Sequence, residues 1–212
     1  MKTLHEQFTK TINNIGFEKL IHPIFYNAKF GIRFEIGNPD IKSYIENEIN
    51  YEYISSAIDK AKALYQNLPH QPDILRIDIY PEEEIPSQNL TLDNLYEIGL
   101  KQPTEVCGDT IIDDDLCYTA RHLYWDLKKT EINLDVLLKS IIMSDFGHFI
   151  SLSSNVYFIN VKDDLLFHLY DDRGADIVSK EKEILIPLYI KFNDLILDYD
   201  REKIDNVFAN SI

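Results

Sequence analysis

The sequence predicts an α+β fold in which a mainly antiparallel sheet of about five strands has helices packed on one face. Two features lead to this prediction. Short segments in which apolar and polar residues alternate are interspersed with longer segments of helical periodicity. Two short segments, 156–161 and 165–170, follow one another as in a β-hairpin. Because the alternating strands have one polar side, the helices are expected to cover only the other side.

The N-terminal part of the chain is predicted to alternate helices with strands. Residues 4–15 have one apolar helical face, and Gly16 follows as a typical helix stop. Residues 30–36 alternate as a half-buried strand, residues 41–67 return to helical spacing, and residues 74–80 alternate again. The second strand is expected to expose its two charged residues, Arg76 and Asp78.

The middle of the chain, residues 81–117, lacks a regular pattern and is predicted to be irregular. Two prolines and three successive carboxylates near its start indicate a solvated loop. The triplet Asp113–Asp115 is also expected in a loop, because a cation-binding loop needs ligands at alternating positions and a glycine turn. We therefore expect no metal site in this segment.

The C-terminal part is predicted to hold most of the remaining regular structure. A strand over 118–127 precedes a helix over 134–144, and the hairpin follows. Residues 175–178 are expected to add a short strand. The next helix carries Pro187 too deep for a straight helix that begins at Ser179, so a kink or a late start is expected there. A last short helix is predicted over 201–208.

Composition and charge narrow the possible functions. The 212 residues are 45% apolar and suit one domain over 1–212, although 1–80 and 118–212 could form two lobes joined by 81–117. The net charge of −15, with no basic stripe, argues against binding to nucleic acid or to an anionic membrane and would attract a basic protein. The same charge could equally serve only solubility.

The expected compartment is the cytoplasm. The first residues do not resemble a signal peptide, and the chain has no long apolar run. Its two cysteines, Cys107 and Cys117, form no metal-binding pair and are expected to be passive thiols in a reducing environment. The sequence leaves the oligomeric state open.

Familiar catalytic motifs are absent from the sequence. It contains neither phosphate-binding glycine loop, no nucleophile elbow and no H-E-x-x-H zinc motif. The six histidines are scattered, with no pair at helical spacing: His5, His22, His70, His122, His148 and His168. No cofactor, metal ligand or catalytic residue is therefore assigned.

Two clusters of acidic and basic residues are the candidate binding site. They consist of Asp171, Asp172 and Arg173, and of Asp198, Asp200 and Arg201. If the clusters converged, their carboxylates could hold Mg²⁺ and their arginines could clamp a carboxylate or a phosphate. Each cluster follows a strand or precedes a helix, where binding groups often lie.

A structural interpretation of the same residues is open beside the functional one. Asp-Asp-Arg-Gly suits a tight turn, in which aspartates bond to backbone amides and Gly174 supplies a positive φ. Arg173 would then pair with Asp198 or Asp200 and tie the hairpin to the last helix. His168 is expected to pack along one strand face with Leu166 and Tyr170 rather than to act as a base.

The region around this motif resembles a known family. The segments that carry the resemblance are Val156–Asn160, Phe167–Gly174, Leu188–Tyr189, Ile196–Arg201 and, less closely, Phe30–Glu35. They are similar to an uncharacterised bacterial family, domain of unknown function 3885, which is recognised by its Tyr-Asp-Asp-Arg-Gly motif. The close match covers residues 154–206, and Leu195 stands where a tryptophan is expected. The resemblance implies no reaction, cofactor or catalytic residue.

Three functions are compatible with these observations. The first is a non-enzymatic module that binds a basic partner protein, of the immunity type or an accessory protein. The second is a metal-assisted hydrolase or phosphoryl-group enzyme that uses the two clusters. The third is a regulatory or structural protein without a pocket.

Overall fold

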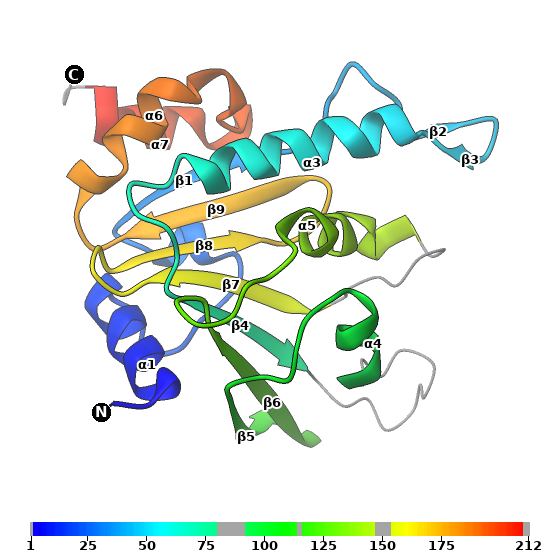
Figure 1. Cartoon of the computed structure of the whole chain (residues 1–212). Coiled ribbons are helices and arrows are strands. Elements are labelled where there is room, and N and C mark those ends of the chain that lie inside the picture. The colour runs from blue at the N-terminus through cyan, green and yellow to red at the C-terminus, as the bar shows by residue number, and fades with distance from the viewer. Residues whose placement is uncertain (1, 80–91, 114–115, 147–153, 210–212) are drawn as a thin grey trace.

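The computed structural model describes residues 2–79, 92–113, 116–146 and 154–209. They form one seven-stranded sheet, a two-stranded hairpin and helices around them (Figure 1). The sheet has the order β1-β9-β8-β7-β4-β6-β5, and every neighbouring pair is antiparallel. The α+β class and the antiparallel sheet are confirmed, whereas the prediction of about five strands is wrong.

The elements have the following bounds. The strands of the sheet are β1 (Phe30–Glu35), β4 (Ile74–Ile79), β5 (Glu105–Asp113), β6 (Leu116–Asp126), β7 (Asn155–Asn160), β8 (Leu165–Leu169) and β9 (Gly174–Ser179). The separate hairpin consists of β2 (Tyr44–Ile45) and β3 (Glu48–Ile49). The α-helices of the described residues are α1 (Leu4–Ile15), α2 (Ile24–Asn27), α3 (Tyr51–Gln66), α4 (Leu92–Glu97), α5 (Leu134–Ile142), α6 (Ile186–Lys191) and α7 (Arg201–Phe208).

Strand β5 accounts for part of the difference in strand number. It lies within the segment predicted to be irregular and pairs along its whole length with β6. Its sequence shows no apolar face because the strand lies at the edge of the sheet, where Val106 and Gly108 are exposed. Asp113 ends this strand, while Asp114, Asp115 and the solvated loop predicted at residues 81–89 lie outside the described residues.

The region predicted as one helix over 41–67 is divided in two. Residues Tyr44–Ile49 form the β2–β3 hairpin, which projects beyond the end of α3 (Figure 1). Its turn residues Glu46 and Asn47 have φ of 49° and 67°, a left-handed geometry typical of a tight hairpin turn. Asn50 then caps α3 by accepting a hydrogen bond from the backbone N–H of Glu52, so the helix begins at residue 51.

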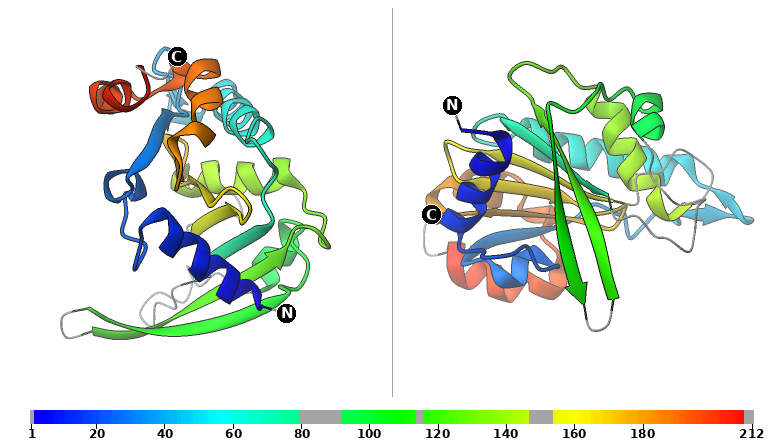
Figure 2. Two further views of the ribbon diagram at one scale, coloured as in Figure 1. Left: turned by 90° about the vertical axis from the view of Figure 1, so that its left-hand side faces the viewer. Right: turned by 90° about the horizontal axis from the view of Figure 1, so that it is seen from below.

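Helices cover both faces of the sheet, so the prediction of helices on one face is wrong. Helices α3 and α5 pack on an apolar row that crosses six strands, formed by Ile32, Ile177, Phe167, Phe158, Leu75 and Trp125. Helix α1 packs on the other face through Phe8, Ile12 and Ile15 (Figures 1 and 2). The polar residues of this second face include charged groups that are buried in pairs. Their polarity in the sequence therefore did not mean that the face is exposed to solvent.

Other local predictions are confirmed. Helix α1 begins at a capping box formed by Thr3 and Glu6 and ends at Gly16, whose φ is 116°. Helix α6 starts late and has Pro187 in its first turn, where a missing N–H costs nothing. Helix α7 has the predicted bounds. No helix in the described part of the chain is long and apolar enough to cross a membrane.

Candidate functional site

The Asp-Asp-Arg-Gly segment forms a turn between β8 and β9. The carboxylate of Asp171 accepts hydrogen bonds from the backbone N–H of Arg173, at 2.7 Å, and from its guanidinium. The carboxylate of Asp172 accepts a 2.6 Å hydrogen bond from the hydroxyl of Tyr53 on α3. Burial and the adjacent Asp171 raise the pKa of Asp172, against the opposing effect of the Tyr53 hydrogen bond. The two aspartates thus close the turn and attach it to α3.

Gly174 serves this turn in a different way from the one predicted. It is not among the residues of positive φ, so the expected left-handed conformation is wrong. The glycine is needed because the ring of Tyr170 lies directly against it. A Cβ atom at this position would lie 2.6 Å from Cζ of Tyr170 and 3.0 Å from the carbonyl oxygen of Phe34. Steric room, not backbone freedom, requires glycine here.

The two predicted clusters have separate partners. Arg173 pairs with Asp171 and with Asp145, 3.4 Å away, and not with Asp198 or Asp200 as expected. Asp200 is buried, accepts a 2.9 Å hydrogen bond from Tyr26 and lies 3.6 Å from Arg33. Within the described residues no salt bridge joins the two clusters.

The second cluster divides between surface and interior. Asp198 is exposed and pairs with Arg201 at 3.1 Å. Arg201 also donates hydrogen bonds to the carbonyl oxygens of Asn193 and Ile196, which fixes the start of α7. This pair therefore has a structural role that does not depend on a ligand.

One group of carboxylates has the spacing of a cation site. Oxygen atoms of Asp145, Asp171 and Asp172 lie within 4.8 Å of one another. All three aspartates already have partners, Arg173 for Asp145 and Asp171 and Tyr53 for Asp172, so a cation would have to replace those contacts. The group acts as a positioning cluster for the turn.

An exposed surface lies beside this turn, and we call it the hairpin face. Three large apolar side chains project from it, with exposed fractions of 45% for Tyr44, 57% for Ile45 and 58% for Tyr51. Four exposed carboxylates accompany them, those of Glu46, Glu48, Glu52 and Asp145. Tyr44 is 5.5 Å from the ring of Phe146, which continues the surface to Asp145 and Arg173.

The opposite face of the sheet carries an unbroken line of polar residues, which we call the polar row. Each member lies directly opposite the next across neighbouring strands: Arg33, Asp176, His168, Tyr157, Arg76, Tyr124 and Glu105. The prediction that Arg76 and Asp78 are exposed is wrong, since their side chains are only 12% and 3% exposed. Helix α1 and the segment that follows it cover this face.

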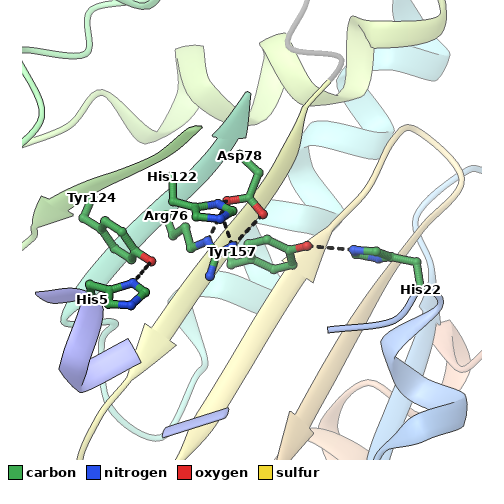
Figure 3. Close-up of polar contacts among 7 residues, drawn as sticks. All are labelled: His5, His22, Arg76, Asp78, His122, Tyr124 and Tyr157. Atoms are coloured by element: carbon green, nitrogen blue, oxygen red, sulfur yellow. Dashed lines mark hydrogen bonds and ion pairs between the residues drawn. The ribbon is translucent and has the colours of Figure 1, made fainter. Parts of the chain in front are cut away.

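Arg76 forms the charged centre of one half of this face (Figure 3). Its guanidinium donates to both oxygens of Asp78, at 2.6 and 2.9 Å, and lies over the ring of Phe8 at 4.4 Å. His122 lies 2.6 Å from Asp78 through Nδ1. Burial alone would raise the pKa of Asp78, but His122 and Arg76 outweigh it and hold the pKa below its usual range.

Arg33 forms a similar centre in the other half. It pairs with Asp176 at 3.0 Å and stacks on Tyr26 and Tyr170 at 5.0 and 5.6 Å. Burial raises the pKa of Asp176 despite the opposing charge of Arg33. Both arginines are thus neutralised by buried carboxylates and enclosed by aromatic rings.

His168 lies between the two arginine centres and differs from both. It is 2% exposed, and among the described residues neither ring nitrogen has a hydrogen-bond partner. Its ring stacks against Tyr157 at 5.0 Å and lies 4.7 Å from the ring of His22, which is tilted by 54°. Burial, followed by the nearby His22 and Arg33, holds the pKa of His168 well below its usual range. The predicted packing of this histidine along a strand face agrees with the structure.

Sequence reasoning missed the polar row as a unit. Polar residues alternate with apolar ones in several of the predicted strands. The sequence did not show that polar residues of seven strands lie opposite one another on one side of the sheet. One feature of the sequence could have indicated the polar row. In several strands arginine, histidine or aspartate alternates with apolar residues, so these charged residues share one side of the sheet.

Comparison with known proteins places these features in a family context. A family model described as a domain of unknown function, DUF3885, matches residues 4–200, which extends the resemblance seen at 154–206 over most of the chain. The chain is 30% identical over 200 residues to the uncharacterised protein YnaE of Bacillus subtilis (strain 168). That match covers 85% of this chain and 92% of YnaE. No solved structure matches.

Proposed function

Because the chain belongs to the DUF3885 family, whose role is unknown, its surface has to indicate its function, and we propose that it is a non-enzymatic binding module that docks a basic partner protein through the hairpin face. The observation that carries the proposal is the exposure of Tyr44 and Ile45 on the projecting hairpin and of Tyr51 at the start of α3, with exposed carboxylates nearby. An immunity-type or accessory protein is the specific form that this function would take.

The apolar side chains of the hairpin face supply the contact area. Aromatic residues dominate the binding energy of protein interfaces because they bury a large area at a small cost in conformational entropy. The ring of Tyr44 is already held against Phe146, which itself lies 6.4 Å from the ring of Tyr53. Such a pre-ordered tyrosine loses little freedom when a partner covers it.

The charge of the face determines the chemistry of the partner. Glu46, Glu48, Glu52 and Asp145 form an acidic rim, and the net charge of −15 extends the attraction for a basic protein. Arg173 is 72% exposed at this rim, where its guanidinium could donate hydrogen bonds to a carboxylate of the partner. Asp171 and Asp172 would act by holding Arg173 and the turn in place. Asp198, Asp200 and Arg201 lie outside the hairpin face.

Removing the tyrosines of the hairpin face is expected to weaken partner binding. The variant Tyr44→Ala/Tyr51→Ala should weaken binding on the order of tenfold to a hundredfold, the usual cost of losing aromatic hot spots. The matched control is Tyr96→Ala/Tyr199→Ala, which removes two exposed tyrosines elsewhere. The measurement is affinity capture from lysate of the native host, followed by titration of the purified captured protein against each variant.

Three results are expected from that experiment. The captured protein must be basic and stoichiometric, its affinity must fall steeply between about 50 and 500 mM salt, and the control must bind as the wild type does. A partner whose affinity ignores salt, or one that binds the hairpin variant as tightly as the control, would contradict it. Failure to capture any stoichiometric partner would count against it equally.

A further inference from the structure

The segment of residues 16–29 crosses the polar row, and we call it the strap. It connects α1 to β1 and includes α2. Phe17, Ile24 and Phe25 bury their side chains beneath it. Its central residue His22 lies over the sheet and points toward Tyr157 in Figure 3. Unlike His168 below it, His22 is exposed, so the strap has solvent on its outer side.

Within the described residues, hydrogen bonds attach the strap to the surrounding protein at three points, and each point involves an ionisable group. Nε2 of His22 lies 2.7 Å from the hydroxyl of Tyr157. The backbone N–H of Phe25 donates to Oδ2 of Asp176 at 3.2 Å. The hydroxyl of Tyr26 donates to Asp200 at 2.9 Å. The attachment therefore depends on the charge state of the polar row and of Asp200, which starts the last helical region.

Within the part of the chain that the structure describes, a proton on His168 would find no available counter-charge. Asp176 faces it from β9, but its oxygens already accept from Arg33 and from the strap itself. Arg33 from β1 and His22 from the strap face it as cations or potential cations, and Tyr157 and Tyr170 flank it with their rings. Only water could solvate the charge, and the strap excludes water from this position.

The carboxylate that acts on His22 is likewise already bound to other side chains. Asp78 on β4 is the carboxylate that acts on it, and this carboxylate is already bound by Arg76 and His122. Burial lowers the pKa of His22, and Asp78 offsets this effect only in part. The two histidine rings, 4.7 Å apart, thus meet at the point where the strap meets the sheet, and burial lowers the pKa of each.

We propose that the strap is an acid-sensitive gate: protonation of His168 and His22 releases residues 16–29 and exposes the polar row to solvent. The direction follows from proton linkage. With the strap open, both histidines titrate near 6.5, whereas in the closed form they take up protons only at lower pH. The open form thus binds more protons below about pH 6.5, and acidification favours it by up to about tenfold per pH unit for each histidine.

Asp176 limits the range in which this effect acts. Its pKa is raised in the closed form, so its protonation favours the closed form as the pH approaches the acidic range. The gate should therefore open mainly between about pH 6.5 and 5, above the range where aspartates titrate. A device of this kind is independent of the hairpin face, which lies on the other side of the sheet.

Hydrogen exchange of the intact protein tests the gate. Exchange of strap amides is measured by mass spectrometry at pH 7.5, 6.5 and 5.5 and corrected for the intrinsic pH dependence of exchange. Protection of the strap should be nearly constant above pH 6.5 and should fall between 6.5 and 5.5 by about fivefold if one histidine controls it, or about thirtyfold if both do. Peptides from β7 and β8 should keep their protection, which distinguishes gate opening from global unfolding.

Variants assign the effect to the histidine pair. His168→Phe keeps an aromatic ring in the stack but cannot be charged, so most of the pH dependence should disappear, and in His22→Phe/His168→Phe all of it should. The control His70→Phe alters an exposed histidine that pairs with Asp163 and should behave as the wild type does. An unchanged strap in the wild type, or the same loss of protection in the double phenylalanine variant, would overturn the proposal.

A second measurement covers the case in which the variants do not fold. The imidazole signals of wild-type His22 and His168 are followed by NMR from pH 7.5 to 5. The proposal requires both rings to gain protons in the same pH range in which the strap amides lose protection. If His168 stays neutral while the strap exchanges, or becomes protonated beneath a protected strap, the gate does not exist.

Discussion

Replacing Asp78 by alanine is expected to lower the free energy of unfolding by about 3–5 kcal/mol. The carboxylate is 3% exposed and is the counter-charge of Arg76, whose own side chain is 12% exposed. Without it, the guanidinium remains buried among Phe8, Tyr124 and Tyr157 with its charge uncompensated. Chemical denaturation at pH 7 measures the loss, and Asp59→Ala, which removes an exposed aspartate of α3, is the control.

The double variant Arg76→Met/Asp78→Leu separates the pair from the cost of breaking it. Apolar replacements remove both charges together, so the double variant should be more stable than Asp78→Ala. Because the pKa of Asp78 lies below its usual range, its contribution is present above about pH 4 and is lost as the pH falls further. A loss under about 1 kcal/mol in Asp78→Ala would show that Arg76 finds water or another partner.

Gly174→Ala is expected to destabilise the protein by about 3 kcal/mol, at the upper end of the usual cost of overpacking. The new methyl group would meet the ring of Tyr170 and the carbonyl oxygen of Phe34, and the backbone of β1 cannot move without disturbing its pairing with β9. Thermal and denaturant unfolding measure the effect.

Gly31→Ala provides the comparison for this prediction. Its added Cβ would meet the side chains of Val178 and Phe25 at 2.9 and 3.2 Å, and the nearest backbone atom is 3.5 Å away. Side chains can adjust more easily than a strand, so the loss should be smaller than in Gly174→Ala. Combining Gly174→Ala with Tyr170→Ala should reduce the added cost of the glycine substitution, because the ring is gone. An equal loss in the Gly31 and Gly174 variants would refute the steric explanation.

Local patterns in the sequence were sufficient for many of the elements. Helix α1, the β7–β8 hairpin and helix α7 depend on periodicity, caps and turns formed by residues close in sequence. Strand β5 was not predictable in this way, because it is held at the edge of the sheet by its pairing with β6, and Val106 and Gly108 within it are exposed. The helix expected over 41–67 failed at residues 44–49, where the left-handed turn at Glu46 and Asn47 outweighs helical spacing.

The candidate site shows the same division. The Asp-Asp-Arg-Gly motif was recognisable as a turn, and Asp171 and Arg173 do bond within it. Its long-range partners, Tyr53 for Asp172 and Asp145 for Arg173, come from other elements and were not visible. The expected partners of Arg173 in the second cluster were wrong because Arg33, on β1, binds Asp200 instead.

The sequence by itself determined the α+β class, the acidic character and the alternation of each strand, because these properties depend on composition and on neighbours along the chain. The tertiary structure alone decided that the polar sides of the strands form one largely covered row and that the hairpin projects from the protein with exposed side chains. The reason is physical: an alternating strand shows which residues share a side, but not which side another element will cover. Only the packing of α1 and the strap made Arg33, Arg76 and His168 interior residues.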